Sequence, residues 1–338
     1  MLFRSREWLL RLKSLAPDRP VFMYFAPGAV HAPLQAPERW VAPFKGQFDM
    51  GWDAYRRLVF ERQKARGAIP EGTELTPRPP EIPAWDSLDP ARQKIAARLM
   101  EVFAGFLSQA DHEIGRVLEA FRETGQLDNT MVVFIAGDNG ASLEGSLNGT
   151  DNIMELVNGI DTPAQDVLAH LDQIGGPLSN PHYPVGWAWA GNTPLRRWKR
   201  YLHQGGMSDP LIVHWPKGIA ARGEVRGQYA HVVDVMPTIL EALNLEAPAT
   251  LNGTTQRPLE GVSFAHSFAE AGAPTRKQIQ YYEMIGSRAL WHDGWKAVVE
   301  QPQGEELTEE MLARQRWELY HVAGDFSECT DLADKHPD

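Results

Sequence analysis

Asp138 and Asn139 are the side chains best placed to do chemistry, because both follow an apolar run in the sequence MVVFIAGDNGASL, which begins at Met131. Ligands of open α/β sheets bind outside the carboxyl ends of the strands, which is where this pair stands. Both side chains offer oxygen to a hard cation, and Gly140 lets the backbone turn sharply beneath it. The alternative is an ordinary turn, since Asp-Asn-Gly is also a common way to leave a strand. Calcium or magnesium needs about six oxygens, so other ligands would be required.

Two further segments contain groups that could handle an anion. His31 follows an apolar run in the loop GAVHAP, where the alternative is an ordinary loop histidine. Lys199 lies in NTPLRRWKRYLHQGG, a basic cluster that also contains Arg196, Arg197, Arg200 and His203. Such a cluster in an acidic protein suggests an anionic small ligand, although a solvated helix face is the simpler explanation.

The composition limits the kinds of partner. The 338 residues include 33 basic and 44 acidic ones, and the net charge of −11 disfavours nucleic acid or an anionic membrane as main partner. No apolar run approaches the roughly 20 residues of a membrane span. Cys329 is the only cysteine, which excludes an internal disulfide and a zinc site built on several thiolates. The N-terminus predicts an amphipathic helix without a signal peptide, so the default location is cytoplasmic, and the oligomeric state stays open.

Three short apolar runs predict buried strands of one sheet, at Pro20–Phe25, Met131–Ala136 and Leu211–Trp215. Between the first two, apolar residues spaced three and four apart predict a long helix. Its N-cap is Asp89, proline follows at the first helical position, and Gly125 ends it. The alternation of helix and strand predicts an α/β core with a sheet sandwiched by helices.

The rest of the chain predicts less regular structure. Residues 40–85 are polar and rich in proline, so we expect a surface excursion that adds little to the core. Helical patterns occur near Ala164–Ile174 and after Asp234, which we expect to cap a helix running to about Leu243. After Gly261, two strands around an Asp293-Gly294 turn and a third in RWELYHV predict a small antiparallel sheet. We therefore divide the chain into an α/β domain over residues 1–260 and a smaller α+β subdomain over residues 261–338.

Together these pieces resemble the type I, formylglycine-dependent sulfatases. The resemblance rests on Asp138-Asn139-Gly140, the His-x-Pro loop at His31, Lys199 ahead of Gly-Gly, and HVVDVMPTIL. More narrowly, GWAWAGNTPLRRWKRYLHQGGMSDPLIVHWP is similar to the large bacterial arylsulfatases. The resemblance implies an alkaline-phosphatase-like fold and an enzyme that hydrolyses small-molecule sulfate esters to an alcohol or phenol and sulfate.

The resemblance also implies roles for individual residues. One calcium ion would be bound by Asp138 and Asn139, with two more aspartates from an upstream strand. His31 and Lys199 would contact the sulfate and the leaving oxygen, and the choice of general acid between them stays open. His203 is a candidate for substrate binding. Gln204 replaces the glutamate of the family's HEGG sequence, which removes one carboxylate near these groups.

The family's nucleophile has no counterpart in this sequence. Formylglycine is made within a Cys/Ser-x-Pro/Ala-x-Arg motif, and Cys329 lies in SECTDLAD without the proline or the arginine. We therefore expect a chain truncated at its N-terminus, and also at its C-terminus, that is inactive by itself. The alternatives are a non-catalytic remnant or pseudogene product, and a phosphonate or phosphodiester hydrolase of the same superfamily, because a metal and an anion clamp would serve either ester.

Overall fold

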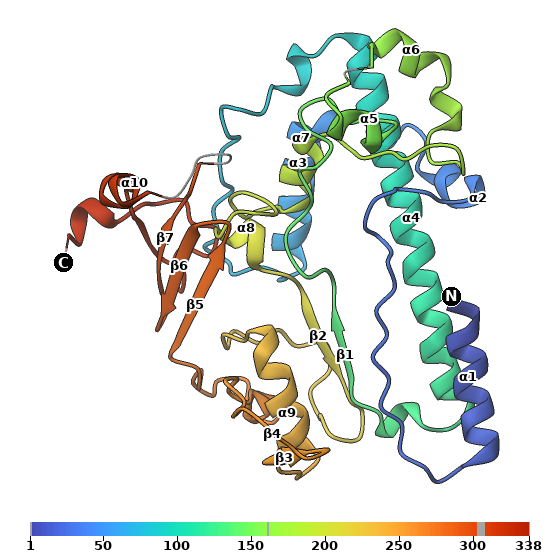
Figure 1. Ribbon diagram of the computed structural model, residues 1–338, viewed down its shortest axis with the longest axis vertical. Coiled ribbons are helices and arrows are strands. Elements are labelled where there is room, and N and C mark those ends of the chain that lie inside the picture. The colour runs from blue at the N-terminus through green and yellow to red at the C-terminus, as the bar shows by residue number, and fades with distance from the viewer. Residues whose placement is uncertain (1, 161, 303–307, 338) are drawn as a thin grey trace.

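The computed structural model describes residues 2–160, 162–302 and 308–337. Its longest element is helix α4 (Pro90–Glu123), which runs along one side of the molecule (Figure 1). The Asp89 carboxylate caps this helix by accepting a hydrogen bond from the Arg92 backbone N–H at 3.0 Å, and Gly125 follows its end with φ of +68°. The predicted long helix is thus confirmed at both ends.

Helix α1 (Leu2–Leu15) packs beside the C-terminal half of α4 (Figure 1). Leu9 is fully buried against Val117, Ala120 and Phe121 of α4, so the predicted amphipathic N-terminal helix is confirmed. Within the described residues, no helix has both the length and the apolar character needed to span a membrane.

The main core lies between α4, α3 (Gly51–Ala65) and α7 (Val185–Gly191). Trp52 of α3 meets Trp85 and Trp187 edge to face, with ring centroids 4.8 and 5.9 Å apart. The prediction that residues 40–85 add little to the core is therefore wrong. The segment is polar on average, but its few large apolar side chains, Trp52 and Trp85 among them, pack together with Trp187 from a distant part of the sequence.

Arg56 shows how a charged residue joins this core. Its side chain is almost fully buried, and its guanidinium donates hydrogen bonds to the carbonyls of Trp189, Pro194 and Leu195 and to the Thr76 hydroxyl. These bonds compensate the guanidinium for the water it has lost and tie α3 to the segment that follows α7.

Strands β1 (Val132–Ile135) and β2 (Leu211–His214) form a two-stranded antiparallel sheet, in which Ile135 faces Leu211 and Val132 faces His214. The prediction of one sheet of three buried strands is correct for this pairing and wrong in two respects. Residues 20–26 form no strand, and neither β1 nor β2 is buried. Both differences have one physical cause, which is that the described chain places no further strand against these segments.

The C-terminal part contains a four-stranded antiparallel sheet in the order β5-β6-β7-β8, which confirms the predicted small antiparallel sheet but with four strands where three were predicted. Its turn between β6 and β7 uses Asp293 and Gly294, with φ of +44° and +82°, as expected of a tight hairpin. Its strands are β5 (Ile279–Met284), β6 (Ser287–His292), β7 (Trp295–Val299) and β8 (Glu318–His321).

The remaining elements are short. The predicted helix near residue 164 is α6 (Ala164–Ala169), and the one after Asp234 is α9 (Val235–Ala242). The others are α2 (Glu38–Val41), α5 (Ile153–Val157), α8 (Gln204–Met207), α10 (Glu309–Arg314), and the two-residue strands β3 (Thr250–Leu251) and β4 (Thr254–Thr255).

Candidate functional site

The turn that carries Asp138 and Asn139 follows β1 directly and is fixed by glycine. Asp138 is exposed, Asn139 is half-buried, and the Asn139 amide donates to Asp138 Oδ1 at 2.6 Å. The Gly140 N–H donates to the Gly206 carbonyl at 2.9 Å. A Cβ atom at Gly140 would lie only 1.7 Å from the Gly205 carbonyl oxygen, so no other residue fits. The close backbone contact brings the Asp138 turn against the Gly-Gly segment.

Lys199 reaches the same region through a second backbone contact. Its N–H donates to the Ala141 carbonyl at 3.1 Å, two residues beyond Asn139. The Ala141 N–H in turn donates to Asn192 Oδ1 at 3.0 Å. The Asp138 turn and the loop that carries Lys199 are therefore one hydrogen-bonded unit.

The Lys199 ammonium forms an ion pair with Glu144, with 3.1 Å between Nζ and Oε1, and Arg200 approaches the same oxygen at 3.6 Å. Burial tends to raise the pKa of Glu144, but hydrogen bonds from Ser142 and Lys199 outweigh it, and the pKa is lowered overall. Glu144 is therefore ionised at neutral pH and holds the ammonium in place.

His31 and His182 complete this cluster. His31 is exposed, and its loop is tied to the other histidine by the Leu34 N–H, which donates to the Pro181 carbonyl at 3.2 Å. His182 is buried, with Nδ1 2.9 Å from the Tyr183 carbonyl. Burial lowers the pKa of His182, and electrostatic interactions with His31 and Lys199 lower it further, against the raising effect of Tyr183 and Glu144. His182 is thus a neutral imidazole in electrostatic contact with His31 and Lys199.

Asp209 is a carboxylate that our sequence reasoning missed. Gly137, at φ of +107°, lets it approach closely, since a Cβ atom there would lie 3.1 Å from Asp209 Oδ1. Burial, and then the negative charge of Asp138, raise the pKa of Asp209 to about 6. The missing signal was the pairing of β1 with β2: in an antiparallel pair, the residue before β2 lies beside the residues after β1.

The oxygen donors at this end of β1 suit a hard cation in kind but not in number. Asp138 and Asp209 offer carboxylates and Asn139 an amide oxygen, which are ligands that calcium prefers. Calcium takes about six or more oxygens, and these three side chains cannot supply them. Among the residues that the structure describes, no cluster of three or more His, Cys, Asp or Glu side chains could hold a metal ion.

His203, which we predicted to bind substrate, is buried in this structure, where its side chain is 0% exposed. It lies between two glutamates, with Nδ1 3.2 Å from Glu300 and Nε2 2.8 Å from Glu318. Despite its burial, these hydrogen bonds raise the pKa of His203. The imidazole joins the loop of Lys199 to the β5–β8 sheet.

The basic residues around Lys199 fall into two groups with different partners. Arg197 forms ion pairs with Glu300 at 2.8 Å and Glu81 at 2.5 Å, and Arg196 lies 3.8 Å from Glu318. These two arginines connect the loop to other parts of the chain. Lys199 and Arg200 are left on the side of Glu144, where the two histidine loops also lie.

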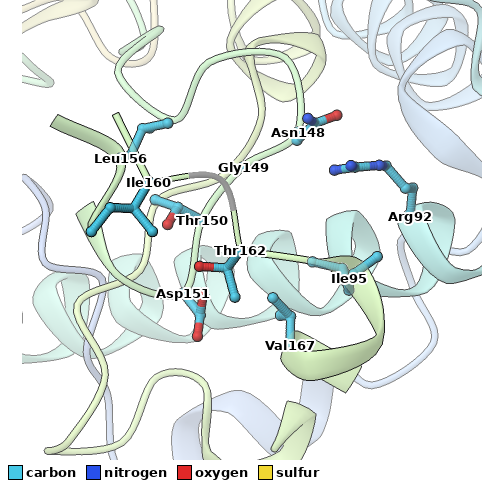
Figure 2. Close-up of a pocket in the computed structure, with 11 residues that line it drawn as sticks. Arg92, Ile95, Asn148, Gly149, Thr150, Asp151, Leu156, Ile160, Thr162 and Val167 are labelled. Atoms are coloured by element: carbon cyan, nitrogen blue, oxygen red, sulfur yellow. The ribbon is translucent and has the colours of Figure 1, made fainter. Parts of the chain in front are cut away.

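A separate pocket lies between the start of α4 and residues 148–167. Figure 2 shows Arg92 and Asn148 at one side of it and Asp151, Thr162 and Val167 at another. Its volume is about 30 Å³. A cavity of that size holds on the order of one water molecule.

Comparison with known proteins finds similarity to sulfatases. The family described as "Sulfatase" matches residues 2–245, and "N-sulphoglucosamine sulphohydrolase, C-terminal" matches residues 197–337. An uncharacterized sulfatase of Schizosaccharomyces pombe is 30% identical over 97% of this chain and 57% of its own length. An arylsulfatase of Klebsiella aerogenes is 31% identical over 77% of this chain and 54% of its own length. The chain thus spans about half the length of these curated relatives.

Solved structures agree on the fold. A Bacteroides fragilis protein assigned as a sulfatase matches with a TM-score of 0.55 and 16% identity, over 99% of this chain and 54% of its own. The structure of Ps i-CgsB matches with a TM-score of 0.56 and 18% identity, over 99% of this chain and 51% of its own. At these identities the likeness concerns the arrangement of the chain, and both matches again cover about half of the larger protein.

Proposed function

Because the chain belongs to the sulfatase family, we propose that it supplies the metal-binding and anion-binding part of an arylsulfatase-like sulfuric ester hydrolase. The reaction cleaves a small-molecule sulfate ester to an alcohol or phenol and sulfate. One observation carries the proposal: Lys199, paired with Glu144, belongs to the same hydrogen-bonded unit as the Asp138 turn and interacts electrostatically with His182, as His31 does. Two cationic or protonatable groups beside a hard-oxygen site suit an ester of a strong oxyacid.

Lys199 and His31 have the chemistry to act on the ester. The ammonium offsets negative charge that develops on the sulfuryl oxygens, and either group can give a proton to the departing oxygen. The ion pair with Glu144 fixes the position of the Lys199 ammonium. His182 is neutral, so it neither repels an incoming cation nor competes with the cation for the anion.

Asp138 and Asn139 would hold the calcium ion, with Asp209 at its side. When bound, the cation would polarise the sulfuryl oxygens. It would also offset the repulsion between the two carboxylates, which raises the pKa of Asp209. Since three side chains do not fill the coordination shell, we propose that this chain binds calcium only weakly by itself.

Cys329 does not replace the missing nucleophile. Burial raises the pKa of its thiol, so the reactive thiolate is scarce at neutral pH. Its sequence context also lacks the proline and arginine from which formylglycine is made. We therefore propose that residues 1–338 bind and polarise a sulfate ester but do not turn it over.

The test compares this chain with a fusion in which the part of the Klebsiella arylsulfatase outside the match is joined to it. Both are produced with a formylglycine-generating enzyme and calcium, and release of the phenol from an aryl sulfate is followed by absorbance. We expect turnover by the fusion only. Lys199→Ala should lower its kcat by about 10²-fold or more, because a charge-stabilising group is lost. Lys217→Ala, which removes an exposed lysine outside the cluster, is the matched control.

Two results would overturn the proposal. One is hydrolysis by the 338-residue chain that survives Cys329→Ala and is abolished by Asp138→Ala. The other is a folded fusion, with formylglycine verified by mass spectrometry, that is inactive or is indifferent to Lys199→Ala.

A further inference from the structure

The two-stranded sheet is apolar, yet β1 is half-buried along most of its length and β2 is mostly exposed. Its strands read VVFI and LIVH, and Ile212 is 56% exposed. Continuous apolar strands are typical of sheets that are covered on both faces. In Figure 1 the pair stands between the helical side of α1 and α4 and the C-terminal sheet, as a ribbon of its own. The sequence of these strands is therefore suited to more neighbours than the described chain gives them.

The register shows which edge of β1 is open. The Ala136 N–H donates to the Pro210 carbonyl at 3.0 Å, so the backbone N–H and C=O of Ala136 point toward β2. In an antiparallel pair this direction alternates, and therefore Phe134 and Val132 also bond to β2 while Val133 and Ile135 face away from it. Within the described residues, no backbone hydrogen bond reaches Val133 or Ile135 from another segment.

Residues 20–26 show the same feature in a second place. Val21, Met23 and Phe25 pack on the cluster around Leu9, while Phe22 and Tyr24 between them are 70% and 86% exposed. This alternation is that of a strand with one face covered. Across residues 20–26, the described structure contains no backbone hydrogen bond. An apolar strand-like segment without a ladder partner is the edge of an incomplete sheet.

The comparisons indicate what completes it. The Schizosaccharomyces pombe sulfatase and the two matched structures align with nearly the whole of this chain but with only about half of their own length, and the matched structures share its arrangement. We propose that the open edge of β1 and the outer face of residues 20–26 bind β-strands of the sulfatase segment that these relatives contain outside the match. The occupant is one polypeptide segment, and main-chain hydrogen bonds to Val133 and Ile135 carry its recognition. The proposal depends on the family fold and not on catalysis.

Amide hydrogen exchange tests this residue by residue. In the isolated chain we expect Val133 and Ile135 to exchange fast and Phe134, bonded to β2, to exchange more slowly. In the fusion with the relative's segment, exchange at Val133, Ile135 and residues 21–25 should slow by about tenfold or more, as for amides in a closed sheet. This readout needs a folded protein only, so a fusion that is folded but inactive would contradict the proposed function and leave this inference standing.

Variants separate docking from general stabilisation. Added in trans, the part of the Schizosaccharomyces pombe sulfatase outside the match should associate with the chain, and Ile135→Glu or Phe22→Glu should weaken association by about tenfold or more. Leu178→Glu, at a residue that is 93% exposed on another segment, is the control and should leave association unchanged.

Two outcomes overturn the inference. In a folded fusion, exchange at Val133 and Ile135 could stay as fast as in the isolated chain. Alternatively, sedimentation could show that the isolated chain is a dimer in which these two amides are already protected, which would make a second copy the occupant.

Discussion

Glu328→Gln should destabilise the chain more than any other single neutralisation of a glutamate. Glu328 and Lys296 are both 0% exposed, and their ion pair measures 2.7 Å between Nζ and Oε1. The second carboxylate oxygen accepts a hydrogen bond from the Gln204 N–H at 2.7 Å. Glu328 thus connects β7 to α8, next to the loop that carries Lys199.

The loss in free energy of unfolding is expected to be large because Glu328→Gln leaves the buried Lys296 charge without its partner. Burial lowers the pKa of Lys296, and the charge of Glu328 opposes that effect. Removing one member of a buried pair costs about 3–5 kcal/mol, whereas replacing both by apolar or neutral groups is often close to neutral. Since a domain is stable by roughly 5–15 kcal/mol in total, Glu328→Gln should remove a large share of the stability. The double variant with Lys296→Met should recover most of it.

The assay is urea unfolding followed by tryptophan fluorescence at pH 7. Glu310→Gln is the matched control, because Glu310 is exposed and pairs with an exposed arginine, so its loss should cost no more than about 1 kcal/mol. A cost for Glu328→Gln similar to that of the control would refute the reasoning. The reasoning would also be refuted if the double variant lost as much free energy of unfolding as the two single variants together, because the two residues would then not be coupled. If Glu328→Gln does not fold, Lys296→Met alone provides the comparison.

Two further predictions concern the loop of Lys199. Because the pKa of His203 is raised in the folded state, its stabilising contribution is complete below the unfolded pKa of about 6.5 and is lost as the pH rises through the folded pKa. The melting temperatures of wild type and His203→Gln should therefore converge toward alkaline pH. A difference in melting temperature that stays constant with pH would contradict this. Gly140→Ala should prevent stable folding, because the added Cβ would meet a carbonyl oxygen. The control Gly115→Ala, in open space on α4, should stabilise the protein by about 0.5–1 kcal/mol, as measured by circular dichroism melting. A stably folded Gly140→Ala protein would contradict the close contact.

Local signals were sufficient to predict several elements. The long helix was predictable because Asp89, Pro90 and a regular apolar spacing all act within a few residues of each other. The Asp293-Gly294 hairpin was predictable because its turn needs positive φ at both positions. Asp234 was predicted as a helix cap, but its carboxylate bonds the N–H groups of His231 and Val262 and the Lys277 ammonium instead. The helix still begins next to it.

Contacts between distant segments were not predictable in this way. The polar composition of residues 40–85 concealed Trp52, whose burial depends on Trp187 in another part of the sequence. The resemblance to sulfatases led to Asp138, His31 and Lys199, because a motif names such residues directly. It did not lead to Asp209 or His182, because their positions depend on strand register and on backbone contacts between loops.

The incomplete coordination shell and the open sheet edge have a common geometric cause. The backbone groups of Ile135 face the open edge of β1, and Asp138 lies three residues further along the chain. A strand that pairs with this edge would bring its own side chains to the same end of the sheet as Asp138, Asn139 and Asp209. We propose that the oxygens a calcium ion here would still need come from the segment that closes the sheet, because the repulsion between Asp138 and Asp209 would make the pair a poor site without them. On this reasoning, the surface that we propose to bind further strands would also be the surface that completes the proposed metal shell.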